Sequence, residues 1–285
     1  MSAYNRPSDL PSYERPPVSE VVLSVQFAST PQFQIVHAGL FWHLVRDQFP
    51  NVSEQTPLQS VFETFTGPAL APPGPIQVQT FSVPPFPRFW FESEDKAYVL
   101  QLQQDRILLN WRAISNDSVY PRYETLRERF MAQVRRLAEF FESQRFGQLS
   151  PNQCEVTYIN SISVDENVSP YAHLDRITPL WSDKARKISG LEVERTVIQT
   201  VFILKSAAQP YGRLYVIFTP ALRTIGSLRP IFHLEMTARG RPETETLDAA
   251  FQLLDQERSA IVRAFTDVTK EEMHKTWGRN DIVQS

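Results

Sequence analysis

The sequence predicts an α+β protein in which two antiparallel β-meanders are each backed by one long helix. Three observations favour this fold class. Strand-like segments follow one another closely in both halves, each half contains a long segment of helical periodicity, and residues 97–113 have the pattern of a β-hairpin. At 285 residues the chain is long enough for one large domain or two modest ones. We divide it into an extended N-terminal arm (1–17), a first α+β half (18–150) and a second α+β half (151–285), and expect the halves to pack as one unit.

The hairpin is the most specific of these features. A two-residue loop at 104–105 places only apolar pairs on one face, and a slip by one residue would destroy the match. These pairs are Leu102 with Ile107, Leu100 with Leu109, and Tyr98 with Trp111. The opposite face then carries a polar row, formed by Gln101, Gln103, Asn110 and Arg112.

The first half begins with a strand at 19–27, in which apolar residues alternate with partly polar ones. Thr30-Pro31 then predicts the N-terminus of a helix that runs to about residue 49. Its apolar stripe is Phe33, Val36, Leu40 and Leu44, widened by Phe41, Trp42 and Val45. So much apolar surface indicates a helix sandwiched between layers, around which the sheet would curve.

A proline-rich stretch at 50–75 separates this helix from the following strands. Alternation predicts strands at 76–83, 88–92, 97–103 and 106–113. A helix then follows to about residue 145. Its inward face is predicted to carry Tyr123, Leu126, Phe130, Val134, Leu137 and Phe141.

The second half has a similar order. Strands are predicted at 153–163, 191–204, 213–219 and 230–238, with a short helix or loop at 169–180, and a long helix at 243–265. That helix is expected to face inward with Leu247, Phe251, Leu254, Ile261 and Phe265. The T-x-x-E spacing of Thr269 and Glu272 predicts a final helix, which Gly278 ends.

Both halves thus finish with a meander and a long helix, although their sequences do not align. We therefore treat internal duplication as an architectural hypothesis. One continuous curved sheet would then be analogous to TATA-binding-like or helix-grip arrangements.

Composition and charge exclude several classes of protein. The net charge is −3 and neither half is basic, so a domain that binds polyanions without specificity is not expected. The one cysteine, Cys154, lies in a strand pattern and is expected to be a small buried hydrophobe in a reducing cytosol. No signal peptide and no membrane span are predicted, and we expect a cytoplasmic protein.

Several segments carry a resemblance to a known family. VLQLQQDRILLNWR (99–112) followed by YPRYE (120–124) is similar to the signature of a sporadically distributed family of uncharacterised bacterial proteins. RPPVSEVVLSVQF (15–27), TYINSI (157–162) and HKTWGR (274–279) resemble that family too, in the same order along the chain. The family supplies no catalytic residues to carry over. Its patchy occurrence implies an accessory role, for example in defence or toxin neutralisation.

The polar row of the hairpin is the first candidate binding site. Amides and a guanidinium on rigid strands suit recognition of a peptide backbone, a base edge or an anion. The alternative is an ordinary solvated sheet face in which Arg112 pairs with a nearby acid.

Catalytic and metal sites have weaker candidates. His233 and Glu235 are two apart on a strand and share a face, which suits a proton-transfer pair or two metal ligands. No third ligand stands nearby, and structural polar positions are the preferred interpretation of the pair. No metal site is predicted. Both glycine-rich phosphate-binding motifs are missing from the sequence, so no cofactor is expected.

These observations favour a non-enzymatic protein that binds a macromolecule, with a protein or a second copy of the chain as its partner. Two alternatives remain open. One is a cofactor-free enzyme that uses His233 and Glu235. The other is a nucleic-acid binder that uses the arginine-rich helix at 122–145, whose arginines could also simply pair with its own glutamates.

Overall fold

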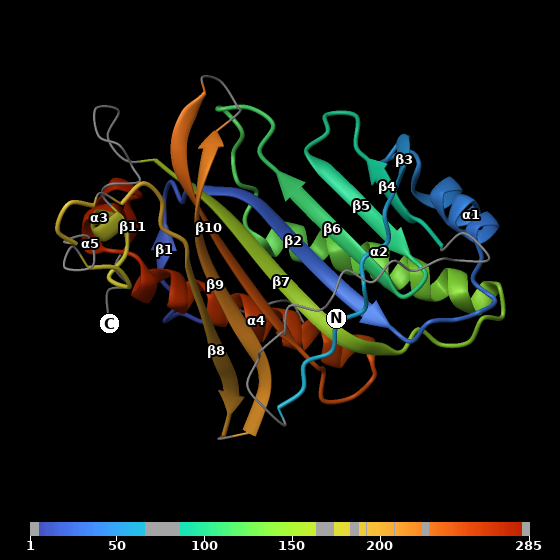
Figure 1. The fold of residues 1–285 in the computed structure, drawn as a ribbon. Coiled ribbons are helices and arrows are strands. Elements are labelled where there is room, and N and C mark those ends of the chain that lie inside the picture. Colours follow the sequence, from blue (N-terminus) through green and yellow to red (C-terminus); the bar gives the residue numbers. More distant parts are fainter. Residues whose placement is uncertain are drawn as a thin grey trace.

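One large antiparallel sheet and two long helices dominate the fold (Figure 1). The computed structural model describes residues 6–65, 86–163, 174–182, 188–191, 193–207, 209–223 and 228–280. The strands are β1 (Ser12–Tyr13), β2 (Val18–Phe27), β3 (Asn51–Gln55), β4 (Arg88–Glu92), β5 (Tyr98–Gln103), β6 (Arg106–Arg112), β7 (Pro151–Ile162), β8 (Ile198–Ser206), β9 (Gln209–Arg223), β10 (Arg229–Gly240) and β11 (Arg279–Asn280). The helices are α1 (Ile35–Val45), α2 (Tyr123–Ser143), α3 (Leu174–Ile177), α4 (Leu247–Val268) and α5 (Glu271–Thr276).

The strand order of the main sheet is β3-β4-β5-β6-β2-β7-β10-β9-β8. Strands β2 and β7, the first long strand of each half, pair at the centre and join the halves into one sheet. In each half the last strand lies beside the first, and the remaining strands continue outward. The predicted α+β class with its antiparallel meanders is confirmed. Strand order alone does not test a duplication of sequence, which stays a prediction.

The predicted hairpin register is confirmed. Leu102 pairs with Ile107, Leu100 with Leu109 and Tyr98 with Trp111. The leucines and the isoleucine are almost completely buried, because this face packs toward the helices. The alternate residues of β5 and β6 therefore point to the other face of the sheet.

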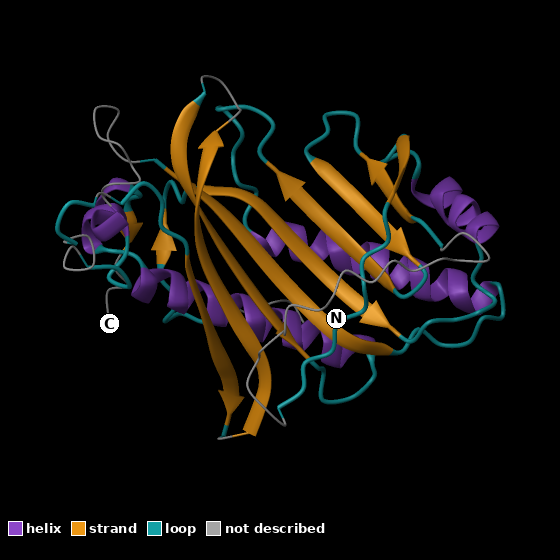
Figure 2. Cartoon of the chain, in the orientation of Figure 1, coloured by secondary structure: helices purple, strands orange, loops and turns teal. Residues whose placement is uncertain are grey.

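Helices α2 and α4 lie together across one face of the sheet (Figure 2). All six residues predicted to face inward from α2 are buried, and four of the five predicted for α4 are buried with Leu247 half-buried. At the start of α4 the Thr246 hydroxyl accepts a hydrogen bond from the N–H of Ala249 at 3.3 Å, which caps the helix. The two helices and one sheet face thus form the core.

The prediction for the first helix is wrong in its extent and its direction. Helix α1 begins at Ile35 rather than after Thr30, and its cap is Gln34 paired with His37. The predicted stripe residues Val36, Leu40 and Leu44 are exposed. Phe41 and Val45, which were predicted only to widen the stripe, face the core together with Ala38. The helix lies at one end of the sheet and is not sandwiched between layers, so the sheet does not curve around it (Figure 1). An almost wholly apolar helix gave no polar face by which its orientation could be predicted.

Strand β3 was not predicted from the sequence. The strand expected at 76–83 lies outside the described residues and stays a prediction. The predicted cap of the last helix is wrong. Thr269 does not cap the last helix, because its hydroxyl donates to the Phe265 carbonyl at 2.5 Å and contacts Nε2 of His274 at 2.8 Å. Lys270 takes the N-cap position instead. Gly278 follows the helix with a φ of 64°, the left-handed backbone that favours glycine after a helix.

The N-terminal arm is fixed to the end of the molecule that carries α5. Strand β1 pairs with β11, and Tyr13 packs edge-on against Phe265 and Trp277 at ring distances of 5.3 and 6.3 Å. Cys154 is buried as expected, with its Sγ 3.6 Å from the Ala250 carbonyl. Across the described ranges, no helix has the length and apolar character needed to span a bilayer.

Candidate functional site: the polar face of the sheet

The sheet face opposite α2 and α4 is polar across its width. Alternate residues of β2, β5, β6, β7, β9 and β10 place amides, guanidinium groups and carboxylates there. Many of these side chains are nonetheless buried, including Gln26, Gln101, Gln103, Gln153 and Arg213. Buried polar groups are costly unless they are hydrogen-bonded, so their partners define what this face does.

Three members of the predicted polar row bond to neighbouring side chains of the sheet. Gln101 accepts hydrogen bonds from Arg88 at 2.9 Å and from Trp90 at 3.0 Å, and donates to Asn110 at 2.6 Å. Asn110 in turn donates to Glu20 at 2.6 Å. Arg112 forms an ion pair with Glu92 at the end of the row. These contacts make a rigid network along the hairpin.

The fourth member, Gln103, binds a peptide backbone. Its Oε1 accepts from the N–H of Leu58 at 2.7 Å, and its Nε2 donates to the carbonyl of the same residue at 2.8 Å. Nε2 also donates to Asp105 at 2.9 Å, which fixes the orientation of the amide. Leu58 belongs to a segment without helix or strand that crosses the polar face, residues 58–65, which we call the strap.

Further glutamines on the polar face contact the strap in the same manner. Gln26 Oε1 accepts from the N–H of Val61 at 3.3 Å, and Gln153 Oε1 accepts from the N–H of Glu63 at 3.4 Å. Arg106 joins Gln26 to the strap, because its Nη2 donates to Gln26 at 2.7 Å and to the Gln59 carbonyl at 2.9 Å. Main-chain groups at alternate strap residues, Gln59, Val61 and Glu63, are therefore held by side chains from β6, β2 and β7.

Glu63 is the charged anchor of the strap. Its side chain is only 3% exposed, and its carboxylate forms an ion pair with Arg213 and accepts from the Tyr215 hydroxyl at 2.8 Å. Arg239 lies 3.6 Å from the same carboxylate. Burial and the hydrogen bond to Glu63 raise the pKa of Tyr215 to about 12, so the phenol stays a donor. Arg213 Nη2 also donates to the Thr64 carbonyl at 2.7 Å.

Sequence reasoning identified Gln103 but missed the rest of the strap contacts. Gln26 and Gln153 carry a usable signal, since each stands at an outward position of a strand that is otherwise rich in apolar residues. The sequence around Glu63 gives no signal of its role, because its partner Arg213 is 150 residues away.

The catalytic candidates His233 and Glu235 both point to the polar face from β10. In the sheet His233 lies between Ser161 and Thr219, whereas Glu235 lies between Ile159 and Ile217. Burial lowers the pKa of His233, and the Glu235 carboxylate opposes this shift. Within the described ranges, no three His, Cys, Asp or Glu side chains are grouped so as to hold a metal ion.

Three arginines of α2, the helix of the nucleic-acid alternative, contact other residues of this protein. Arg127 pairs with Asp255, Arg129 lies 3.9 Å over the ring of Tyr98, and Arg135 lies 5.4 Å from the ring of Phe251. These contacts direct the guanidinium groups onto the protein surface beside α2.

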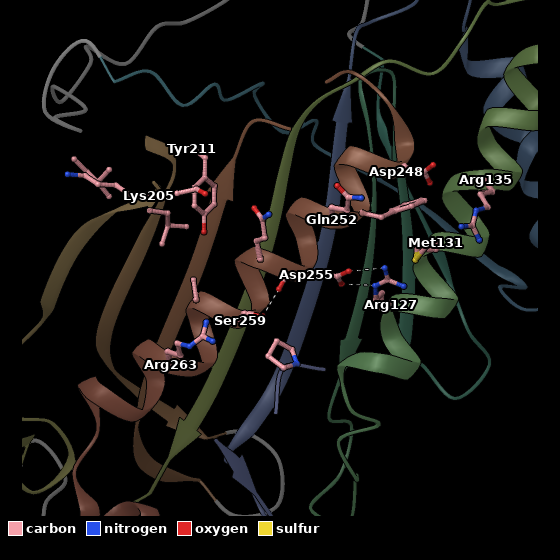
Figure 3. Close-up of a pocket in the computed structure, with 17 residues that line it drawn as sticks. Arg127, Met131, Arg135, Lys205, Tyr211, Asp248, Gln252, Asp255, Ser259 and Arg263 are labelled. Carbon is pink, nitrogen blue, oxygen red and sulfur yellow. Dashed lines mark hydrogen bonds and ion pairs between the residues drawn. The ribbon is translucent and has the colours of Figure 1, made fainter. Parts of the chain in front are cut away.

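A hollow of about 1040 Å³ lies over α4, between α2 and the strands β8 and β9 (Figure 3). The ion pair between Arg127 and Asp255 crosses it, and Arg263 at its edge pairs with Asp9 at 2.6 Å. Because these charges already satisfy one another, the hollow is a weaker candidate than the polar face.

Comparison with protein-family models and with curated proteins gave no match to this chain.

Proposed function

We propose that this protein binds a partner protein, and that the polar face of its sheet recognises an extended, acid-bearing segment of that partner. The observation that carries the proposal is the double hydrogen bond of Gln103 to the main chain of Leu58. Bonds to main-chain N–H and C=O groups do not depend on side-chain identity, so the same amides can hold another extended segment.

The strap itself suggests what the partner segment looks like. Val61 and Phe62 are 40% and 57% exposed, so they contribute little contact with the sheet. Most of the interaction comes from main-chain hydrogen bonds and from Glu63 between Arg213 and Tyr215. A competing segment therefore needs an extended backbone and one Asp or Glu at the corresponding position.

In this proposal the strap acts as an internal ligand that covers the face until a partner displaces it. Such competition would prevent nonspecific binding of extended chains to the polar face. A cytosolic partner protein also fits the accessory roles that the family resemblance implies, among them the neutralisation of a toxin protein.

A peptide competition experiment tests the proposal. The probe is a fluorescent peptide with the sequence of residues 57–65, PLQSVFETF. In a Glu63→Arg variant the strap is repelled by Arg213 and Arg239, so the peptide should bind at least about tenfold more tightly than to the wild type. Fluorescence anisotropy measures the affinity.

Two controls make the result specific. Glu54→Arg introduces the same charge change on the exposed strand β3 and should leave peptide binding at the wild-type level. Adding Arg213→Ala to the Glu63→Arg variant should abolish the gain. Equal affinity for all of these variants would contradict the proposal, and so would equal binding of a peptide in which lysine replaces the glutamate.

A further inference from the structure

A second, smaller cavity lies on the helix-covered side of the sheet, opposite the polar face, between the start of α2 and the C-terminal half of α4. Its volume is about 510 Å³, within the range typical of small-molecule sites. The N-terminal arm forms one wall. We call it the tyrosine cavity; its lining includes Tyr120, Tyr123, Tyr158, Arg258 and Phe265.

Paired tyrosine hydroxyls form part of its polar wall. The hydroxyls of Tyr120 and Tyr158 are 2.9 Å apart, and the two rings meet edge-on at 6.2 Å. Burial raises the pKa of both phenols, so both remain neutral. Because one hydroxyl donates to the other, the pair has one O–H hydrogen left for a ligand.

The charges around the cavity favour an anion. Three lining residues are arginines, namely Arg6, Arg122 and Arg258, whereas Glu124 is the one acidic lining residue within the described part of the chain. Arg6 and Arg122 donate to main-chain carbonyls of the arm, which leaves their positive charge without neutralisation by those contacts. Arg258 lies 5.3 Å over the ring of Tyr123 and 3.9 Å from Glu124.

The remaining wall is apolar. Ile261, Val262 and Phe265 of α4 face the cavity, together with prolines of the arm. A ligand that matches both walls has one anionic group and an apolar or aromatic body.

The backbone of one lining residue is strained. Arg122 has a φ of 69°, which is unfavourable for a residue with a Cβ. Its guanidinium donates to the carbonyls of Tyr13 and Glu14 at 3.0 and 3.2 Å, and these bonds hold both the strained residue and the arm in place. Strain of this kind is concentrated at binding sites, where the surrounding structure holds it.

Segments that were singled out in the sequence also meet at this cavity. Residues 120–124 supply Tyr120, Arg122, Tyr123 and Glu124, residues 157–162 supply Tyr158 and Asn160, and residues 15–27 supply Pro16 and Val18. Segments far apart in the chain thus line one cavity, to which neither the predicted polar row nor the pair His233 and Glu235 contributes.

We propose that the tyrosine cavity binds a small organic carboxylate with an apolar or aromatic body. The carboxylate lies near Arg258 and accepts one hydrogen bond from the Tyr120–Tyr158 hydroxyl pair, while the body packs against Ile261 and Phe265. A monoanion suits this wall better than a dianionic phosphate, since Glu124 lies only 3.9 Å from Arg258.

Isothermal titration calorimetry of the full chain with indole-3-acetate tests the proposal, with the uncharged indole-3-acetamide as the matched ligand. The acetate should bind saturably, and the acetamide at least about tenfold more weakly, because it lacks a charge for the arginines. Tyr158→Phe, which keeps the ring, should weaken acetate binding about fivefold through the loss of one hydrogen bond.

The decisive variant fills part of the cavity with a larger side chain. Val262→Trp occupies the apolar end and should weaken binding at least about tenfold, whereas Val262→Ala should keep it within about threefold. The strap variant Glu63→Arg should leave it unchanged, since the polar face lies across the sheet. No saturable binding of indole-3-acetate, equal affinity for the acetamide, or wild-type affinity in Val262→Trp would each overturn the assignment.

Discussion

Arg127 of α2 and Asp255 of α4 form a two-point ion pair that joins the two long helices. Arg127 Nε and Nη2 donate to the two carboxylate oxygens at 2.6 and 2.8 Å, and the Tyr123 hydroxyl donates to one of the same oxygens at 2.8 Å. The Arg127 side chain is 8% exposed and that of Asp255 is 20% exposed, so solvent screens the pair only weakly.

Replacing Asp255 should therefore destabilise the protein substantially. In Asp255→Ala the buried guanidinium of Arg127 loses the two hydrogen bonds and the charge of Asp255, and we expect the free energy of unfolding to fall by about 3 kcal/mol. Urea denaturation measures the change. Glu245→Gln breaks the exposed pair with Arg241 and should change the stability by less than about 0.5 kcal/mol. Similar losses of stability in both variants would show that the Arg127–Asp255 pair stabilises the protein no more than an exposed ion pair does.

A second prediction concerns Glu257, a fully buried carboxyl group on α4. Burial raises its pKa well above the ordinary value of 4.5, and the carboxylates of Glu155 and Glu63 add to this, while Arg239 opposes it. Because the folded pKa is raised, this group contributes its full stability below pH 4.5 and loses it as the pH rises toward the folded pKa.

Glu257→Gln should remove this pH dependence, because the amide has a similar shape and no ionisation. Relative to the wild type, the free energy of unfolding of the variant should increase progressively above pH 4.5. Chemical denaturation between pH 5 and pH 8 measures the difference. Glu271→Gln, on the exposed side of α5, should show no such trend. A constant difference between Glu257→Gln and wild type across this range would refute the assignment.

The parts of the fold that the sequence predicted are those governed by local pattern. The pairing of Tyr98 with Trp111 follows from a short loop and period-two alternation, and the inward face of α2 follows from helical periodicity. The site was predictable only in part. The position of Gln103 could be inferred, but Leu58 is 45 residues away and Glu63 is 150 residues from Arg213. Contacts at such separations depend on tertiary packing, which no local pattern encodes.

A third prediction concerns the orientation of α1, which the apolar pattern of the sequence did not predict correctly. Leu40 is 48% exposed and Phe41 is fully buried, although they are adjacent on an apolar helix. Leu40→Ser should lower the free energy of unfolding by about 0.5 kcal/mol, whereas Phe41→Ala should lower it by about 3–5 kcal/mol through loss of core packing. Thermal and urea unfolding measure both. A larger loss for Leu40→Ser than for Phe41→Ala would support the predicted inward position of Val36, Leu40 and Leu44.

The fourth prediction concerns the attachment of the strap to the polar face. Gln103→Ala removes both hydrogen bonds to Leu58, so the strap should detach more often from the sheet. Chymotrypsin should then cleave after Phe62 about tenfold faster than in the wild type, corresponding to the loss of roughly 1–2 kcal/mol of local stability. Mass spectrometry of the early fragments identifies this bond. Gln199→Ala, at an exposed position of β8, is the matched control and should leave cleavage after Phe62 unchanged. Unchanged cleavage in Gln103→Ala would mean that the amide does not hold the strap, and the peptide-binding role of the polar face would lose its main support.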